Sequence, residues 1–132
     1  LLSMMLLATE GNRQTVEVSN MGKSKGKLFI AWYNKAEGFR EPEKAAYHRI
    51  VAVNGEGVMP VVFDGIPAGT YAVAVFLDEN DNGKMDTNLF GAPKEKYGFS
   101  NNIFHLTRAA SFREASFVVQ DGKDGTIRIK LK

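Results

Sequence analysis

A corner containing glycine and proline, Phe63-Asp64-Gly65-Ile66-Pro67-Ala68-Gly69-Thr70-Tyr71, leads directly into the apolar run Tyr71-Ala72-Val73-Ala74-Val75-Phe76-Leu77. Glycine and proline favour turns, whereas valine, tyrosine and phenylalanine fit a pleated strand. Successive side chains of a strand point to opposite faces, and in this run both faces are apolar, with small alanines on one of them. The run is therefore expected to be a strand that is buried on both sides.

The rest of the chain repeats this β pattern. Six further segments alternate polar with apolar residues or are rich in β-branched and aromatic ones: Thr15–Ser19, Lys27–Tyr33, Tyr47–Val53, Val58–Phe63, Ala115–Val119 and Thr126–Leu131. One helical turn is expected after Pro42, in Glu43–Ala46. Asp121–Gly125 is typical of a hairpin turn between the last two strands. About seven strands at this spacing predict an all-β fold, an Ig-like or transthyretin-like β-sandwich.

Length and composition fit one domain, expected over residues 10–132. The chain has 132 residues, of which 44% are hydrophobic, so it can form a hydrophobic core without the support of disulfides or metal ions. It has no cysteine, which excludes disulfides, thiolate metal sites and cysteine nucleophiles. The net charge is +2 and no basic stripe alternates with aromatic residues, so nucleic acid is not an expected partner.

The first residues differ from the rest of the chain. Leu1–Ala8 is an apolar run that is too short to span a bilayer, and the polar stretch Thr9–Arg13 follows it. The run resembles the end of a signal-peptide hydrophobic region, with Ala8 as a small residue near the cleavage point. We expect residues 1–9 to be a signal-peptide remnant, and the protein to be exported to the periplasm or beyond without spanning the membrane. The alternative is an ordinary hydrophobic first strand.

The stretch Asp78–Asp86 fits the pattern D-x-N-x-N-G-x-x-D, which matches the first nine positions of an EF-hand loop. Calcium takes about six to eight oxygen ligands, which alternate residues of a tightly curled loop can supply. The expected ligands are the side chains of Asp78, Asn80, Asn82 and Asp86 and the main-chain carbonyl of Lys84.

Two features qualify this calcium hypothesis. Leu89 stands where an EF-hand has its bidentate glutamate, so an EF-hand proper is excluded and Glu95 is a possible additional ligand. Calcium is therefore expected to bind weakly. Ordinary tight turns also prefer Asn, Asp and Gly, which is the alternative explanation of the pattern.

Between Asp78 and Arg113 the β alternation is lost, which predicts one long loop between the fifth and sixth strands. The later part of this segment combines aromatic and amide side chains, a combination that suits a flat, polar ligand such as a sugar. The possible ligand-binding residues are Tyr97, Phe99, Asn101 and Asn102. The alternative is that the two aromatic side chains anchor the loop to the sandwich.

Three stretches of the sequence resemble known families. The run Asp78–Asn102, DENDNGKMDTNLFGAPKEKYGFSNN, is similar to the signature of a bacterial family named domain of unknown function 2141. The corner Phe63–Tyr71 and the closing pattern of Ser116–Leu131 also match it. This resemblance extends from about Gln14 to Lys132 and implies an exported β-sandwich protein without an established activity. The corner also resembles that of transthyretin-like sandwiches and of surface-protein B-type sandwiches, and the calcium-type loop is similar to those of B-type repeats in surface adhesins.

The leading interpretation is a non-catalytic exported module that binds a protein or glycan partner of the cell envelope, or has a structural role there. Its long loop would be ordered by calcium. One alternative is a carbohydrate-binding module that uses the loop aromatics. The less favoured alternative is a small hydrolase built from Ser100, His105 and Asp86. No nucleophile elbow surrounds Ser100, and His48 and His105 are not in metal-binding spacing, so enzymatic activity is not expected.

Overall fold

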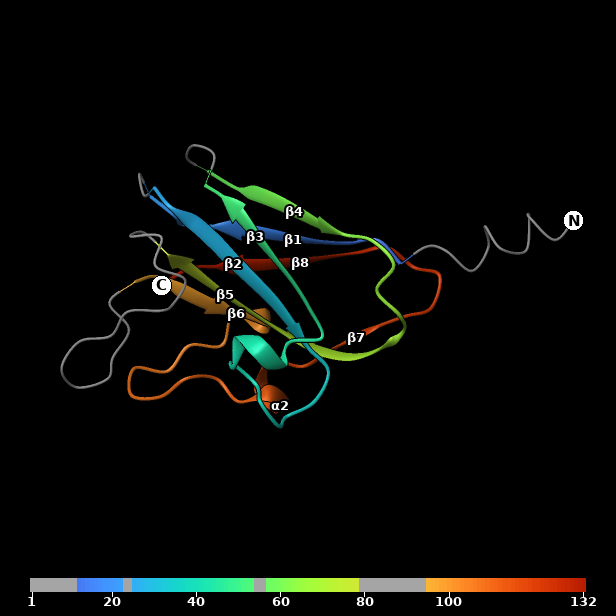
Figure 1. Ribbon diagram of the computed structural model, residues 1–132. Helices are drawn as coiled ribbons and strands as arrows, with labels where there is room; N and C mark the ends of the chain where they lie inside the picture. Colours follow the sequence, from blue (N-terminus) through green and yellow to red (C-terminus); the bar gives the residue numbers. More distant parts are fainter. Residues whose placement is uncertain (1–11, 23–24, 54–56, 79–94) are drawn as a thin grey trace, which may run out of the picture.

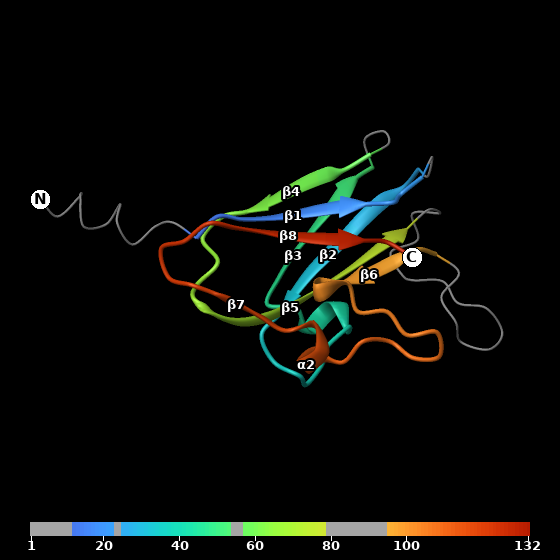
Figure 2. The same cartoon turned by 180° about the vertical axis from the view of Figure 1, so that it is seen from behind.

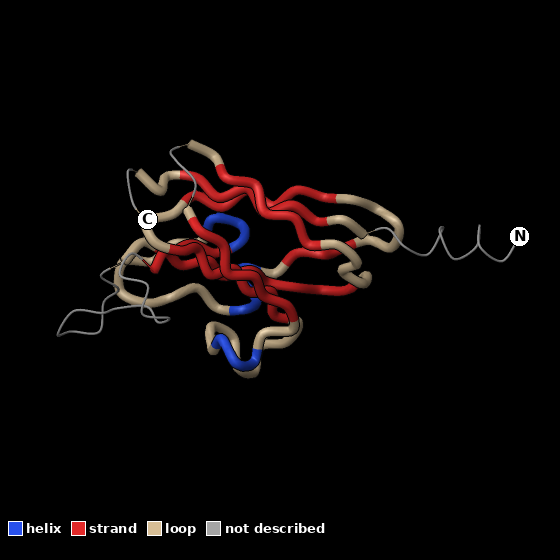
Figure 3. The backbone as a smooth tube through the Cα atoms, turned by 45° about the horizontal axis from the view of Figure 1, so that its top comes forward, coloured by secondary structure: helices blue, strands red, loops and turns tan. Residues whose placement is uncertain are grey.

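The computed structural model describes residues 12–22, 25–53, 57–78 and 95–132, which form two β-sheets with very little helix (Figure 1). The smaller sheet has the order β4-β1-β8 and consists of β4 (Met59–Phe63), β1 (Gln14–Ser19) and β8 (Gly125–Lys130). The larger sheet has the order β3-β2-β5-β6 and consists of β3 (Tyr47–Ala52), β2 (Lys27–Tyr33), β5 (Gly69–Asp78) and β6 (Tyr97–Phe99), with β7 (Phe117–Val119) also paired to β5. The all-β sandwich is thus confirmed, and Figure 3 shows its two layers of strands.

The main core lies between the sheets because each strand turns its apolar side inward. In β1, Val16 and Val18 are buried while the residues between them are partly exposed. Trp32 of β2 is fully buried at the centre, within 5.6 Å (ring centroid to ring centroid) of three aromatic rings. These rings belong to Phe63, Tyr71 and Phe117.

A second apolar cluster covers the outer face of the larger sheet. Two connections fold back onto that face: one contains the 3-10 helix η1 (Pro42–Lys44), and the other contains η2 (Ser100–Asn102) and α2 (Phe112–Ala115) (Figure 2). Phe39 lies at the centre of this cluster, with ring centroids within 5.9 Å of those of Tyr33, Phe99 and Phe112. Strand β5 is therefore buried on both sides, as its sequence predicts.

The corner before β5 carries the chain from one sheet to the other. Tyr71 donates a hydrogen bond from its hydroxyl to the carbonyl of Pro67 at 2.8 Å. This bond fastens the first residues of β5 to the turn, while Gly65 adopts a positive φ of 72°. The sequence-based interpretation of this corner as a turn between two strands is confirmed.

The sandwich is closed along one side and open along the other. On the closed side, Tyr97 of β6 exchanges two backbone hydrogen bonds with Lys132, and Leu131 N–H donates to the carbonyl of Ser19. The residues that follow β8 therefore join both sheets. On the open side, β3 and β4 are the outermost strands of their sheets.

Three expectations from the sequence need correction. The described residues contain eight strands, one more than the seven segments predicted, because β6 lies inside the predicted long loop. That loop is also interrupted by η2 and α2. Finally, β7 and β8 do not form a hairpin, because β7 pairs with β5 and β8 pairs with β1 in the other sheet.

The structure also bears on the helical turn that the sequence predicts, on membrane-spanning helices and on the first residues of the chain. The helical turn expected at Glu43–Ala46 is present as η1, one residue earlier in the chain. None of the described helices is long and apolar enough to cross a membrane. The predicted signal-peptide remnant, residues 1–9, lies outside the described residues.

Candidate functional site

Two buried carboxylates lie at the adjoining ends of β5 and β6. Asp78 is the last residue of β5, and Glu95 precedes β6 by two residues. Their exposed fractions are 4% and 7%, low values for acidic residues. The sequence predicts Asp78 as a calcium ligand and Glu95 as a possible additional one.

Strand pairing places these two carboxylates opposite each other. In the antiparallel ladder, Phe76 pairs with Tyr97, and Leu77 N–H then donates to the carbonyl of Lys96 at 2.9 Å. Continuing the register by one pair sets Asp78 against Glu95. Asp78 alternates with Phe76 along β5, so its side chain faces the outer side of the sheet. Glu95 lies two residues before Tyr97, in the bend that leads into β6.

A lysine belongs to the same row of side chains. In the ladder between β2 and β5, Lys27 is the partner of Asp78. Lys27 therefore lies on the other side of Asp78 from Glu95, on the same face of the sheet. In sequence order across the sheet, the row contains one lysine and two acidic residues, so its formal charge is negative.

The remaining predicted calcium ligands are not part of the described structure. Asn80, Asn82, Lys84 and Asp86 lie outside the described residues, as does Leu89. Within the described ranges, no group of three or more histidine, aspartate or glutamate side chains could hold a metal ion. Asp78 and Glu95 are therefore the part of the predicted set whose positions are described.

The predicted aromatic platform belongs to a strand and packs inward. Tyr97 and Phe99 form the two ends of β6, and Phe99 is only 4% exposed. The ring centroid of Phe99 lies 5.8 Å from that of Phe39, and Tyr97 packs against Phe99 and Phe104. Phe99 is therefore not available for stacking on a sugar. Its packing agrees with the alternative that this side chain anchors the segment to the sandwich.

The two predicted amide ligands tie neighbouring segments together. Asn101 Nδ2 donates to the carbonyls of Glu114 and Ser116. Asn102 Oδ1 accepts from Lys130 N–H at 2.8 Å, which links η2 to β8. Both residues adopt a positive φ, which asparagine tolerates better than most residues. Their amides thus have structural partners within the chain.

Ser100 and His105, two of the residues named for hydrolysis, bond to other groups and not to each other. Ser100 is fully buried, and its hydroxyl accepts from Val73 N–H and donates to the carbonyl of Ala115. His105 bonds to Glu114 instead of Ser100, and Asp86 lies outside the described residues. The serine hydroxyl is therefore occupied by backbone groups and unsuited to be an activated nucleophile.

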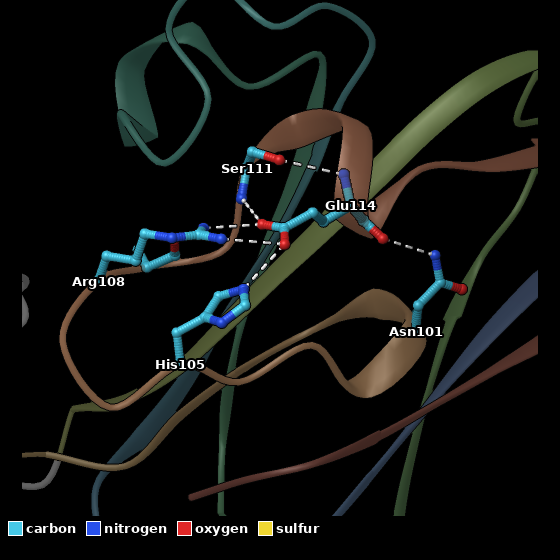
Figure 4. A network of polar contacts seen from close by, with 6 residues as sticks. Asn101, His105, Arg108, Ser111 and Glu114 are labelled. Carbon is cyan, nitrogen blue, oxygen red and sulfur yellow. Dashed lines mark hydrogen bonds and ion pairs between the residues drawn. The ribbon is translucent and has the colours of Figure 1, made fainter.

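Sequence reasoning missed a polar network around Glu114, shown in Figure 4. The Glu114 carboxylate accepts from the Arg108 guanidinium at 2.9 and 3.2 Å, from Ser111 N–H at 2.9 Å and from His105 Nε2 at 2.8 Å. The hydrogen bonds from Arg108, followed by those from Ser111 and His105, hold the pKa of Glu114 well below its usual range. Ser111 and Glu114 form a capping box, whose S-x-x-E pattern is visible in the sequence.

This network fastens the segment between η2 and α2. His105 and Arg108 come from the connection that returns to α2, and Asn101 binds the carbonyl of Glu114 from the other side. The cluster joins three stretches of chain on the surface of the second apolar cluster. It contains no nucleophile within hydrogen-bonding distance of His105 among the described residues, and its geometry is that of a structural clamp.

Residues 16–128 match a protein family described as an uncharacterized protein conserved in bacteria, DUF2141. The chain belongs to this family. The DUF2141 match runs from β1 to β8 and includes the segment that begins at Asp78 and ends at Glu95. It confirms the resemblance seen in the sequence. Neither the curated proteins nor the solved structures include a match to this DUF2141 chain.

Proposed function

We propose that this protein is a non-catalytic, exported binding or structural module of the bacterial envelope, and that calcium orders the connection between β5 and β6. The observation that carries the proposal is the pair of buried carboxylates, Asp78 and Glu95, in opposite positions at the two ends of that connection. Asp78 is at the same time the first residue of the D-x-N-x-N-G-x-x-D pattern.

Charge balance supports a cation at this place. Like charges directly opposite each other across a ladder are unfavourable, and burial strengthens their repulsion because water screens it less. Lys27 supplies one positive charge to the row, which leaves one negative charge in excess. The connection 79–94 adds three acidic residues and two lysines, so the excess becomes two. A divalent cation with oxygen ligands matches that excess, and calcium prefers carboxylate, amide and carbonyl oxygens.

The position of the row indicates what calcium would do. Asp78 and Glu95 stand where the chain leaves one strand and enters its neighbour. A cation that binds both carboxylates would fix these two strand ends, and with them the base of the connection. A partner protein or glycan of the envelope would then meet an ordered surface, whereas chelation would loosen it.

Thermal unfolding of the purified chain tests the calcium site. Unfolding is followed with about 10 mM calcium, with magnesium and with a chelator. For Kd values of about 0.1–1 mM, calcium would stabilise the fold by about 1.4–2.7 kcal/mol and raise the unfolding midpoint by about 4–10 °C. Asp78→Asn and Glu95→Gln remove one charge each with little change in shape, and both are expected to abolish the calcium response.

Asp64→Asn is the matched control. Asp64 is an exposed aspartate that forms an ion pair with Arg13 at 2.8 Å, away from the β5–β6 connection. This variant should keep the full calcium response. Superimposable wild-type curves with calcium and chelator would refute the calcium site. Export is tested separately: fractionation of the natural host and N-terminal sequencing should find the mature chain outside the cytoplasm, starting near Thr9.

A further inference from the structure

Strand β3 lies at the edge of its sheet, and among the described residues its outward backbone groups have no hydrogen-bonding partner. Val53 N–H donates to the carbonyl of Gly26, and the ladder then pairs Lys27 with Ala52 in regular antiparallel register. Backbone groups of an antiparallel strand alternate between its two sides. Val51 and Arg49 therefore direct their N–H and C=O groups toward β2. His48, Ile50 and Ala52 direct theirs to the outside.

The neighbouring edge strand, β4, is protected, whereas β3 is not. Pro60 of β4 has no N–H, and Arg49 Nη1 donates to the outward carbonyl of Val62 at 2.8 Å. Proline and capped carbonyls are common ways of blocking an edge. Within the described parts of the chain, nothing hydrogen-bonds to the outward groups of His48, Ile50 and Ala52. Ile50 is also 56% exposed, a high value for isoleucine.

The pattern of free groups along β3 is complementary to itself. We propose that a second copy of this chain adds its own β3 antiparallel to this edge, with the two-fold axis at Ile50. Ile50 then faces Ile50 of the second copy, and His48 faces Ala52 in both directions. Each of these positions offers one donor and one acceptor toward the partner, so the three facing pairs form six backbone hydrogen bonds.

The side chains favour this pairing over an unrelated occupant. The two Ile50 side chains meet on the outer face and extend an apolar row that already contains Phe29, Phe76 and Tyr97. In the same register, Arg49 faces Val51 and stays bonded to its own Val62. No two like charges face each other along the strand, and such pairs are the usual obstacle to self-association of an edge.

The dimer would contain one continuous sheet made from the larger sheets of both copies. The contact involves one six-residue strand from each copy, so it is small for a protein interface and should be weak. The proposal is independent of the calcium site, because it uses the opposite edge of the larger sheet from β6.

Sedimentation velocity over about 10 µM to about 1 mM chain tests the dimer, because a contact of this size dissociates in that range. The wild-type mass is expected to rise from one chain toward two. Ile50→Lys and Ile50→Glu should each remain monomeric, since two like charges would then face each other on the two-fold axis. An equimolar mixture of the two variants should dimerise again, because lysine then faces glutamate.

Hydrogen exchange locates the contact within the dimer. The amides of Arg49 and Val51 bond to β2 and should exchange slowly at every concentration. The amides of His48, Ile50 and Ala52 should be slowed only in the dimer. Val118→Lys, at a 68% exposed position of β7, controls for the loss of an exposed apolar side chain and should dimerise like the wild type. A wild-type chain that is monomeric throughout, or a dimer that persists in Ile50→Lys, would overturn the proposal.

Discussion

The hydroxyl of Ser100 takes the place of a strand carbonyl opposite Val73. Val73 N–H donates to Ser100 Oγ at 2.9 Å, at the point where β6 has turned into η2. The same hydroxyl donates to the carbonyl of Ala115, the last residue of α2. One fully buried side chain thus joins β5, η2 and α2.

Ser100→Ala should lower the free energy of unfolding by about 1–3 kcal/mol. The substitution leaves the Val73 N–H and the Ala115 carbonyl buried without this partner, and unsatisfied buried groups carry a desolvation cost of that size. Urea unfolding followed by the fluorescence of Trp32 measures the change. Thr107→Ala, at an exposed position, is the control and should change stability by less than about 0.5 kcal/mol. Equal stability of the two variants would contradict the role assigned to Ser100.

Tyr71→Phe should destabilise the fold by about 1 kcal/mol. The variant keeps the ring that packs on Trp32 but loses the hydrogen bond to the Pro67 carbonyl. Tyr47→Phe removes the same atom from a tyrosine that is 37% exposed and lies at the edge of the sheet, so it should be nearly neutral. Differential scanning calorimetry of both variants measures the contrast, and a Tyr47→Phe effect as large as that of Tyr71→Phe would refute it.

Glu114→Gln should reduce stability in a pH-dependent way. The pKa of Glu114 is lower in the folded protein than the value of about 4.5 expected for the unfolded chain, mainly because Arg108 donates to the carboxylate. Its ionised form therefore stabilises the fold above about pH 4.5, and this stabilisation is lost as the pH falls toward the folded-state pKa. The stability gap between wild type and variant should thus narrow on acidification.

Urea unfolding of wild type and Glu114→Gln at neutral pH and at a series of acidic pH values measures this narrowing. Glu41→Gln serves as control because Glu41 forms only an exposed pair with Lys44 at 3.5 Å. Its stability gap from the wild type should be small and nearly constant. A gap for Glu114→Gln that is the same at neutral and acidic pH would rule out the inferred pKa shift.

Gly98→Ala should destabilise the closed side of the sandwich by about 1–3 kcal/mol. A Cβ atom at Gly98 would lie 2.7 Å from Ile129 Cγ2 and 3.2 Å from the carbonyl oxygen of Lys130, so the neighbours would have to move. Combining it with Ile129→Ala tests the cause. Removal of the clashing methyl should make the double variant more stable than the sum of the single effects predicts. If the two losses of stability were strictly additive, the cost of Gly98→Ala would not come from the contact with Ile129.

Most of the strands could be predicted because their own residues show the pattern. Val16 and Val18 alternate with polar residues, and β5 is apolar on both faces, as expected of a strand between two apolar layers. Strand β6 could not be predicted in this way. Its three residues are too few to show alternation, and the middle one is Gly98, whose place in the strand depends on the close approach of Ile129.

The end of the chain shows the limit of local turn chemistry. Asp121–Gly125 does turn, with Lys123 N–H bonded to the carbonyl of Gln120 and Gly122 at a positive φ. The turn determines the direction of the chain, whereas the partner strands depend on distant residues. Phe117 packs on Trp32 beside β5, and Ile129 lies next to β1, so the two strands join different sheets.

The candidate site was partly visible in the sequence. The spacing of the Asp/Asn pattern predicts Asp78 as a calcium ligand, and the sequence offers Glu95 as a possible further one. Their opposition depends on the pairing of β5 with β6, which no local pattern reveals. The sequence places Phe99 in a loop, because the same short strand shows no alternation. The clamp on Glu114 needs His105 and Arg108 to return toward α2, which sequence spacing alone does not specify.

The parallel pairing of β1 with β8 has a consequence for how the protein folds. Gln14 pairs with Gly125 and Ser19 with Lys130. The central strand of the smaller sheet, β1, therefore pairs with a strand that lies more than a hundred residues later in the sequence. Contacts of such long range are slow to form, because a large loop must close before they are made. During synthesis, β1 and β4 can pair early, but the smaller sheet is incomplete until β8 has been translated. Completion of the native sandwich therefore follows the synthesis of β8.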